Sequence, residues 1–184
     1  MTLSPEDAEL FFALWFPLLD YVNTQEQVNP QLKKVERNAP GMTLQVLNNI
    51  TAALWDKIEL LDSYLDSHVE LPEEHRRILS GFRRFVRGNF LIERHLKKGS
   101  VFISCNKNND NVYSVLGIHS PLDELFPSYV LPQMIETSLL PWRDKIITNG
   151  LISGFRVSFG SGMRSSFKEH YLEAKRAGNI ITSL

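Results

Sequence analysis

Residues 139–162, LLPWRDKIITNGLISGFRVSFGSG, constrain the fold more than any other stretch of the chain. Two apolar runs flank a Pro-Trp-Arg-Asp-Lys turn, and glycines at 150 and 154 permit tight bends. Residues 155–159, FRVSF, then predict a last strand. A Gly-Ser-Gly sequence leads into a helix expected from about residue 163 to residue 177, with Gly178 as its C-terminal cap. This stretch therefore predicts two strands joined by a tight turn, a further strand and a closing helix.

Helical patterns come before strand patterns in the rest of the chain. Ser4 and Pro5 start one helix, Thr43 starts an amphipathic helix that is expected to reach residue 66, and Glu73 starts a third. Short apolar runs at 90–96, 101–105, 112–118 and 134–140 predict strands, with a hairpin loop at 106–111 and one helical turn at 122–126.

This segregation indicates an α+β fold rather than alternating α/β units. We expect a helical part over residues 1–87, then a β-sheet part over residues 88–184, packed as one compact unit. The second part should hold a small antiparallel sheet of about five strands and the C-terminal helix. Five short strands with tight turns are compatible with an SH3-like or an OB-like barrel.

Composition indicates the cellular compartment in which the protein is expected. Among 184 residues, Cys105 is the single cysteine, which excludes an intramolecular disulfide and a multi-cysteine zinc site. The N-terminal segment is acidic, unlike a secretory signal. The longest apolar run spans only residues 10–19, whereas a membrane span needs about 20 residues. We therefore expect a cytoplasmic protein without a membrane partner.

Charge is unevenly distributed although the whole chain carries only −1. Residues 1–72 hold 4 Lys/Arg against 11 Asp/Glu, and residues 73–109 hold 9 against 3. The basic segment predicts nucleic-acid binding, pairing with the acidic helix 43–66 or with a partner protein, or a solvated face. Its candidate residues are Arg76, Arg77, Arg83, Arg84, Arg87, Lys97 and Lys98.

Two further sets of residues are candidates for contact with a ligand or partner. A glycine-rich helix start with a nearby arginine is able to hold an anion, although ordinary helix capping explains the same residues. That set comprises Gly160, Ser161, Gly162 and Arg164, with Asp144 and Lys145 from the turn. Trp142 and Arg143, at the tip of the same turn, form a contact surface if the tryptophan is exposed.

No combination of residues points to catalysis, a cofactor or a metal ion. His119 lies near Asp123 and Glu124, but a helix start of the Ser-Pro-x-Asp type explains the aspartate. The histidines are isolated from one another, and a His-x-x-x-His pair is absent from the sequence. Cys105 falls in an apolar strand pattern, which predicts a buried and unreactive thiol.

Three segments together resemble an uncharacterised family of bacterial hypothetical proteins. They are PEDAELFFALWFPLLDYVN (5–23), LLPWRDKIITNGLI (139–152) and SFKEHYLEAK (166–175). The resemblance implies an aspartate at the place of Asn149, and it implies no activity, cofactor or catalytic residue.

The leading hypothesis from the sequence is a non-catalytic cytoplasmic binding or regulatory module whose partner is another protein or a second copy of the chain. One alternative is nucleic-acid binding through residues 76–98. The other is an enzyme or binder of a small anionic ligand near Gly160 and Arg164.

Overall fold

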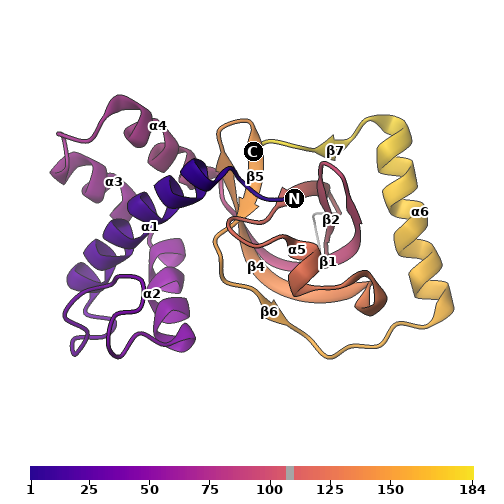
Figure 1. The fold of residues 1–184 in the computed structure, drawn as a ribbon, viewed down its shortest axis with the longest axis horizontal. Helices are drawn as coiled ribbons and strands as arrows, with labels where there is room; N and C mark the ends of the chain where they lie inside the picture. The colour runs from indigo at the N-terminus through magenta and orange to yellow at the C-terminus, as the bar shows by residue number, and fades with distance from the viewer. Residues whose placement is uncertain (107–109) are drawn as a thin grey trace. The chain divides into compact units, whose positions relative to one another are not determined.

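The computed structural model describes residues 1–106 and 110–184, which divide into two compact units (Figure 1). The helical unit is Glu6–Arg83, and the barrel unit combines Met1–Pro5 with Arg84–Leu184. The helical unit contains 7 Lys/Arg and 13 Asp/Glu, a net charge of −6. The barrel unit contains 13 and 8, a net charge of +5. The two units are therefore oppositely charged.

Helix α1 (Pro5–Glu26) is the longest element of the helical unit. The other elements are α2 (Leu44–Asp56), α3 (Glu59–Ser67), α4 (Glu73–Gly81) and the short 3-10 helix η1 (Phe82–Arg84). α1 begins at the expected Pro5, and the Thr43 hydroxyl caps α2 by accepting the Val46 N–H at 3.2 Å. Stacked Trp15 and Trp55, with ring centroids 5.7 Å apart, join α1 to α2 in the core of this unit.

The predicted continuous helix over residues 43–66 is wrong, because the chain leaves helical geometry at Lys57 (φ −134°, ψ 68°). In a straight helix, Leu60 would lie about 120° around the axis from Leu54. The break between α2 and α3 allows both leucines to be buried, together with Trp55 and Tyr64. Burial of several large side chains therefore overrides the single apolar stripe that suggested one helix.

The barrel unit contains β1 (Val86–Leu96), β2 (Gly99–Ser104), β3 (Val112–Leu116), α5 (Leu122–Leu125), the 3-10 helix η2 (Ser128–Val130), β4 (Gln133–Trp142), β5 (Lys145–Thr148), β6 (Ser153–Gly154), α6 (Ser161–Ala177) and β7 (Ile180–Ile181). Residues 107–109 of the predicted hairpin loop at 106–111 lie outside the described residues. The α+β class predicted from the sequence is confirmed, with helices, a sheet and the C-terminal helix α6 (Figure 1).

Within the described residues, five strands close into a barrel. β1 pairs with both β2 and β4, β2 pairs with β3, β3 with β5, and β5 with β4. This order corresponds to the OB-like alternative. The sheet is mixed rather than antiparallel as predicted, because closure places β5 beside β3 in the same direction, and β7 also runs parallel to β3.

Alternation along the strands gives the barrel an apolar interior and a second apolar face outside it. Phe90 and Ile92 of β1 point into the interior cluster, which Leu122 of α5 also enters. Leu91 points the other way, into a cluster with Val101, Ile103, Val112, Phe159 and Tyr171. Helix α6 therefore packs on the outer face of β1, β2 and β3.

The predicted strand at residues 155–159 is wrong, because β6 is limited to Ser153–Gly154 and the following segment is irregular. In that segment Phe159 is buried under α6, whereas Phe155 and Val157 are exposed. The apolar pattern therefore marks one buried side chain and not a paired strand. The division expected at residues 87–88 falls inside β1, which already starts at Val86.

Candidate functional site

A hollow of about 330 Å³ lies at the rim of the barrel, between the end of β1, the segment before β4 and the first half of α6. Its volume is at the lower end of the range for small-ligand sites, about 300 to 1,000 Å³. We call it the rim hollow. Its lining residues are Glu93, Arg94, His95, Ser128, Leu131, Pro132, Arg164, Phe167 and Lys168.

Helix α6 places two of the cations of the rim hollow. Arg164 and Lys168 are four residues apart and therefore lie on the same side of the helix. Tyr171 is buried against the barrel and fixes the helix there, and Phe167 packs edge-on against Phe159 with centroids 5.2 Å apart. The helix is closed by Gly178 in the left-handed conformation (φ 71°), as the sequence predicted.

Arg164 connects α6 to the segment before β4. Its Nε donates to the Phe159 carbonyl at 3.0 Å, and its Nη1 donates to the Leu131 carbonyl at 3.1 Å. Both acceptors are uncharged, so these bonds orient the guanidinium without neutralising it. A guanidinium has five N–H donors, of which these bonds use two.

Glu93 and Arg94 enter the rim hollow through an irregularity in β1. The pairing register with β2 shifts between Ile92 and Arg94, as in a β-bulge, which changes where the side chains point. The Glu93 carboxylate accepts from Arg94 Nε and, at 2.9 Å, from its Nη2. This hydrogen bond raises the pKa of Arg94, so the guanidinium stays charged. Arg94 also lies over the Tyr171 ring, 4.5 Å from its centroid.

The charges that line the rim hollow therefore do not cancel. Among its described lining residues, Glu93 is the only carboxylate, and Arg94 already pairs with it. Arg164 and Lys168 remain, which gives two positive charges facing one small concave space.

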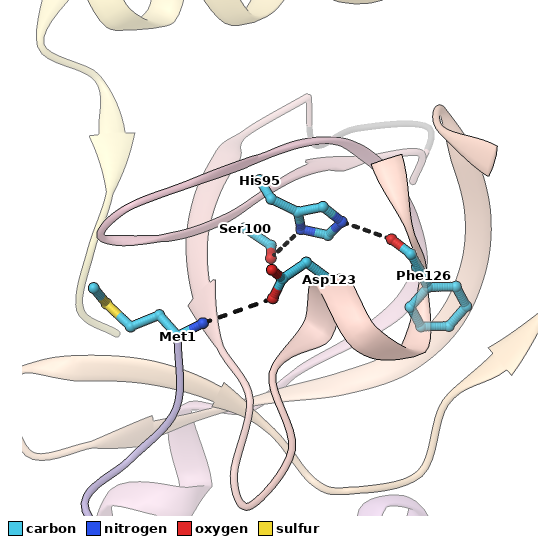
Figure 2. Close-up of polar contacts among 5 residues, drawn as sticks. All are labelled: Met1, His95, Ser100, Asp123 and Phe126. Carbon is cyan, nitrogen blue, oxygen red and sulfur yellow. Dashed lines mark hydrogen bonds and ion pairs between the residues drawn. The ribbon is translucent and has the colours of Figure 1, made fainter. Parts of the chain in front are cut away.

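His95, which lines the rim hollow, makes two polar contacts within the barrel unit (Figure 2). Its Nε2 lies 2.7 Å from the Phe126 carbonyl, and its Nδ1 lies 2.7 Å from the Ser100 hydroxyl. Because a carbonyl only accepts, Nε2 carries the proton, and in the neutral ring Nδ1 accepts from Ser100. The same view shows the Met1 amino group 3.8 Å from the Asp123 carboxylate.

This His–Ser pair has the spacing of a nucleophile and its base, but Ser100 is only 5% exposed. The Ser100 hydroxyl is buried and bonded to His95, so it links β2 to β1. His95 in turn joins both strands to the chain after α5, so the pair stabilises the wall rather than presenting a nucleophile.

The sequence-predicted anion site is only partly brought together. Gly160, Ser161 and Gly162 are exposed at the start of α6, and Arg164 lines the rim hollow. Asp144 and Lys145 instead belong to the β4–β5 hairpin, at the opposite end of β4 from Leu131 and Pro132. The turn charges therefore do not contribute to this site.

The predicted contact surface at the same turn requires a correction. Trp142, the last residue of β4, is fully buried and is the register partner of Lys145 in β5. Arg143 is exposed at the hairpin tip with φ 55°. Cys105 also differs from expectation: β2 ends at Ser104, and the cysteine is exposed rather than buried.

The candidate residues of the predicted basic segment lie in different surroundings. Arg76 Nη1 donates to the carbonyls of Leu65 (2.8 Å) and His68 (3.1 Å), and Arg83 pairs with Asp62 of α3. These two arginines stabilise the end and the side of α3. Arg77, Arg84, Arg87, Lys97 and Lys98 are exposed.

Three candidate residues of the basic segment lie at opposite ends of β1. Arg87 lies near the start of β1, whereas Lys97 and Lys98 follow its end. The strand between them has the length of about nine residues, roughly 30 Å when extended. The acidic side chains of the predicted helix 43–66 are divided between two helices, since Asp56 ends α2 while Glu59, Asp62 and Asp66 belong to α3.

Sequence reasoning missed Glu93, Arg94, His95 and Lys168 as site residues. The spacing between Arg164 and Lys168 was the one available indication, because residues four apart share a helix face. A bulge that brings Glu93 and Arg94 to the same space has no comparable pattern in the sequence.

No family model, curated protein or solved structure matches the chain. The resemblance to a family of bacterial hypothetical proteins therefore stays a prediction. Asn149, where that resemblance implies an aspartate, is buried, and its Oδ1 accepts the Leu151 N–H at 3.2 Å and the Thr137 hydroxyl at 3.4 Å.

No helix among the described residues combines the length and apolar character needed to cross a membrane. The same residues contain no group of three or more His, Cys, Asp or Glu side chains arranged to hold a metal ion.

Proposed function

We propose that this chain is a binding module, and that the rim hollow holds an anionic group of its ligand, a carboxylate or a phosphate. The observation that carries the proposal is the uncompensated charge of Arg164 and Lys168 in a concave space of ligand size. Arg164 is preoriented by two backbone carbonyls, which lowers the entropy cost of presenting its remaining donors.

The surroundings of the rim hollow support anion binding. The guanidinium suits the planar, two-oxygen geometry of carboxylates and phosphates, whereas the lysine ammonium acts as a mobile point charge. The net charge of +5 on the barrel unit favours approach of an anion. Binding without chemistry is the simpler proposal, because the Ser100 hydroxyl beside the site is buried and held by His95.

NMR titration of the ¹⁵N-labelled full chain with inorganic phosphate and with acetate tests this proposal. We expect saturable shifts of amides in residues 93–95, 128–132 and 164–168. Lys168→Gln should weaken binding up to about fivefold, since an exposed charge contributes at most about 1 kcal/mol. Lys175→Gln, an exposed lysine in the last turn of the same helix, is the matched control and should leave binding unchanged.

Two results would contradict anion binding at the rim hollow. One is the absence of saturable shifts in these three segments with both anions. The other is an equal loss of affinity in Lys168→Gln and Lys175→Gln, which would indicate general attraction to a basic protein rather than a defined site.

Single-stranded nucleic acid is the second candidate ligand, favoured by the OB-like strand order and the basic barrel unit. Against it, α6 covers the outer face of Val101, Ile103 and Val112, on the strands that bind oligonucleotides in OB-like barrels. Fluorescence anisotropy with labelled single-stranded DNA and RNA at two salt concentrations tests it. This candidate requires binding that weakens with salt, and no binding at low salt removes it.

A further inference from the structure

The helical unit contains a second concave site, which shares no residue with the rim hollow. Helix α1 buries one side in its core through residues such as Phe11, Trp15 and Leu18. Its other side borders a groove of about 470 Å³, closed opposite by residues 34–36 and within the size range of ligand sites. We call it the α1 groove. Its lining is Phe12, Ala13, Phe16, Pro17, Asp20, Tyr21, Thr24, Lys34, Val35, Glu36 and His68.

One end of this aromatic helix face already holds a guanidinium. Arg37 lies over the Phe12 ring, 5.1 Å from the ring centroid, and its Nη1 is 3.9 Å from the Glu9 carboxylate. A ring face and a carboxylate on the same helix thus hold an arginine side chain from the neighbouring loop. This combination is favourable because the ring quadrupole and the carboxylate both attract a cation.

A ring and a carboxylate also lie together one turn further along α1, inside the α1 groove, although here the carboxylate follows the ring in the sequence. Phe16 stacks on Phe12 with centroids 5.8 Å apart and an interplanar angle of 21°. Asp20, four residues after Phe16, lies on the same side of the helix. Asp20 Oδ1 accepts the Val35 N–H at 2.7 Å, which orients the carboxylate and fixes the opposite wall of the groove.

The other charged groups of the α1 groove largely cancel. Lys34 Nζ lies 3.0 Å from Glu36 Oε2 and forms an ion pair with it, and this pairing raises the pKa of Lys34, with a smaller contribution from the Asp20 charge. His68 is held by the Tyr64 carbonyl, 2.8 Å from its Nδ1. Asp20 is therefore the net negative charge of the groove, beside an aromatic ring.

We propose that the α1 groove binds an arginine side chain of a basic peptide, with the guanidinium beside Asp20 and stacked on Phe16. The aliphatic stem of the arginine would pack on Pro17 and Val35, which line the same groove. Charge complementarity favours this occupant, because the helical unit carries a net −6 and attracts a basic segment. The intramolecular Arg37–Phe12 contact shows that a ring on this side of α1 accepts a guanidinium.

NMR titration of the ¹⁵N-labelled full chain with blocked arginine, and with a short peptide carrying one arginine between glycines, tests the proposal. Blocked citrulline, which has the same shape without the charge, is the ligand control. We expect saturable shifts in residues 12–24 and 34–36 with both arginine probes, and binding of citrulline at least about fivefold weaker.

Three variants of the full chain locate the interaction. Asp20→Asn removes the charge and keeps an acceptor for the Val35 N–H, and Phe16→Leu removes the aromatic face while keeping an apolar side chain. Each should weaken arginine binding about threefold to fivefold. Asp66→Asn, at an exposed carboxylate of α3, is the matched control and should change nothing.

Equal binding of arginine and citrulline would overturn the proposal, as would unchanged affinity in Asp20→Asn. Equal weakening in Asp20→Asn and Asp66→Asn would also overturn it, since that result means attraction to the acidic unit as a whole. Should Phe16→Leu fail to fold, Asp20→Asn decides the question, because it keeps the hydrogen bond that holds the loop.

Discussion

Replacing Tyr171 with alanine should detach α6 from the barrel. Tyr171 is 1% exposed and belongs to the cluster of Leu91, Val101, Ile103 and Val112 on the outer face of the barrel. The Arg94 guanidinium also lies over the ring, 4.5 Å from its centroid. Tyr171 is the fully buried residue of α6, so the helix depends on it for its position.

The expected cost follows from burial. Truncating a buried aromatic side chain to alanine lowers the free energy of unfolding by about 3 to 5 kcal/mol. The contact with Arg94 contributes about 0.5 to 1 kcal/mol of this cost, because it is a cation–π pair at a partly exposed site. Tyr171→Phe keeps the ring and should change stability by less than about 1 kcal/mol.

Urea unfolding and amide hydrogen exchange measure the two consequences. In Tyr171→Ala we expect a lower midpoint and a selective loss of protection in α6, while β2 and β4 keep theirs. Glu173→Ala, at an exposed position of the same helix, should stay within about 0.5 kcal/mol of the original protein. Wild-type protection of α6 in Tyr171→Ala, with a stability loss below about 1 kcal/mol, would refute this account of the helix.

Three further predictions concern other parts of the fold. Arg76→Gln should lower the free energy of unfolding by about 1 to 3 kcal/mol in urea titrations, because the Leu65 and His68 carbonyls lose a charged donor, whereas exposed Arg77→Gln should not. Gly178→Ala should cost about 1 kcal/mol by thermal unfolding, since its φ is 71° and alanine is strained there. Burial, and then the Glu70 charge, raise the pKa of Tyr64 above its ordinary 10.0. The unfolded chain therefore loses this proton first, and stability falls as pH rises above 10.0; Tyr64→Phe should flatten that fall in unfolding titrations, and an unchanged slope would contradict it.

Local features of the chain were predictable because they depend on neighbouring residues. The start of α1 at Pro5, the Thr43 cap of α2 and the Gly178 cap of α6 all follow from side-chain chemistry within one turn. The order of helices and strands also follows from local periodicity, and it sufficed for the α+β class.

Features that depend on distant contacts were not predictable from the sequence. The break after α2 arises because Leu60 and Tyr64 find buried positions that a straight helix denies them. Trp142 looked like the exposed tip of a turn, but the hairpin turns within Arg143 and Asp144 and leaves the tryptophan inside. The parallel pairing of β3 with β5 is a consequence of barrel closure, which no local pattern encodes.

In the candidate site, too, only the features set by neighbouring residues were predictable from the sequence. Arg164 was identified from the glycine-rich start of α6, and it does line the rim hollow. Asp144 and Lys145 were joined to it only because they are close in the sequence, whereas β4 separates them from it. Glu93 and Arg94 meet α6 through a shift of strand register.

Anion binding by Arg164 and Lys168 in the rim hollow can be observed in crystals of the full chain soaked in selenate, whose selenium gives an anomalous signal. We expect an anomalous peak within hydrogen-bonding reach of both side chains, with lower occupancy in crystals of Lys168→Gln soaked at the same selenate concentration. Ordered selenate at other basic side chains, with none in the rim hollow, would contradict the claim.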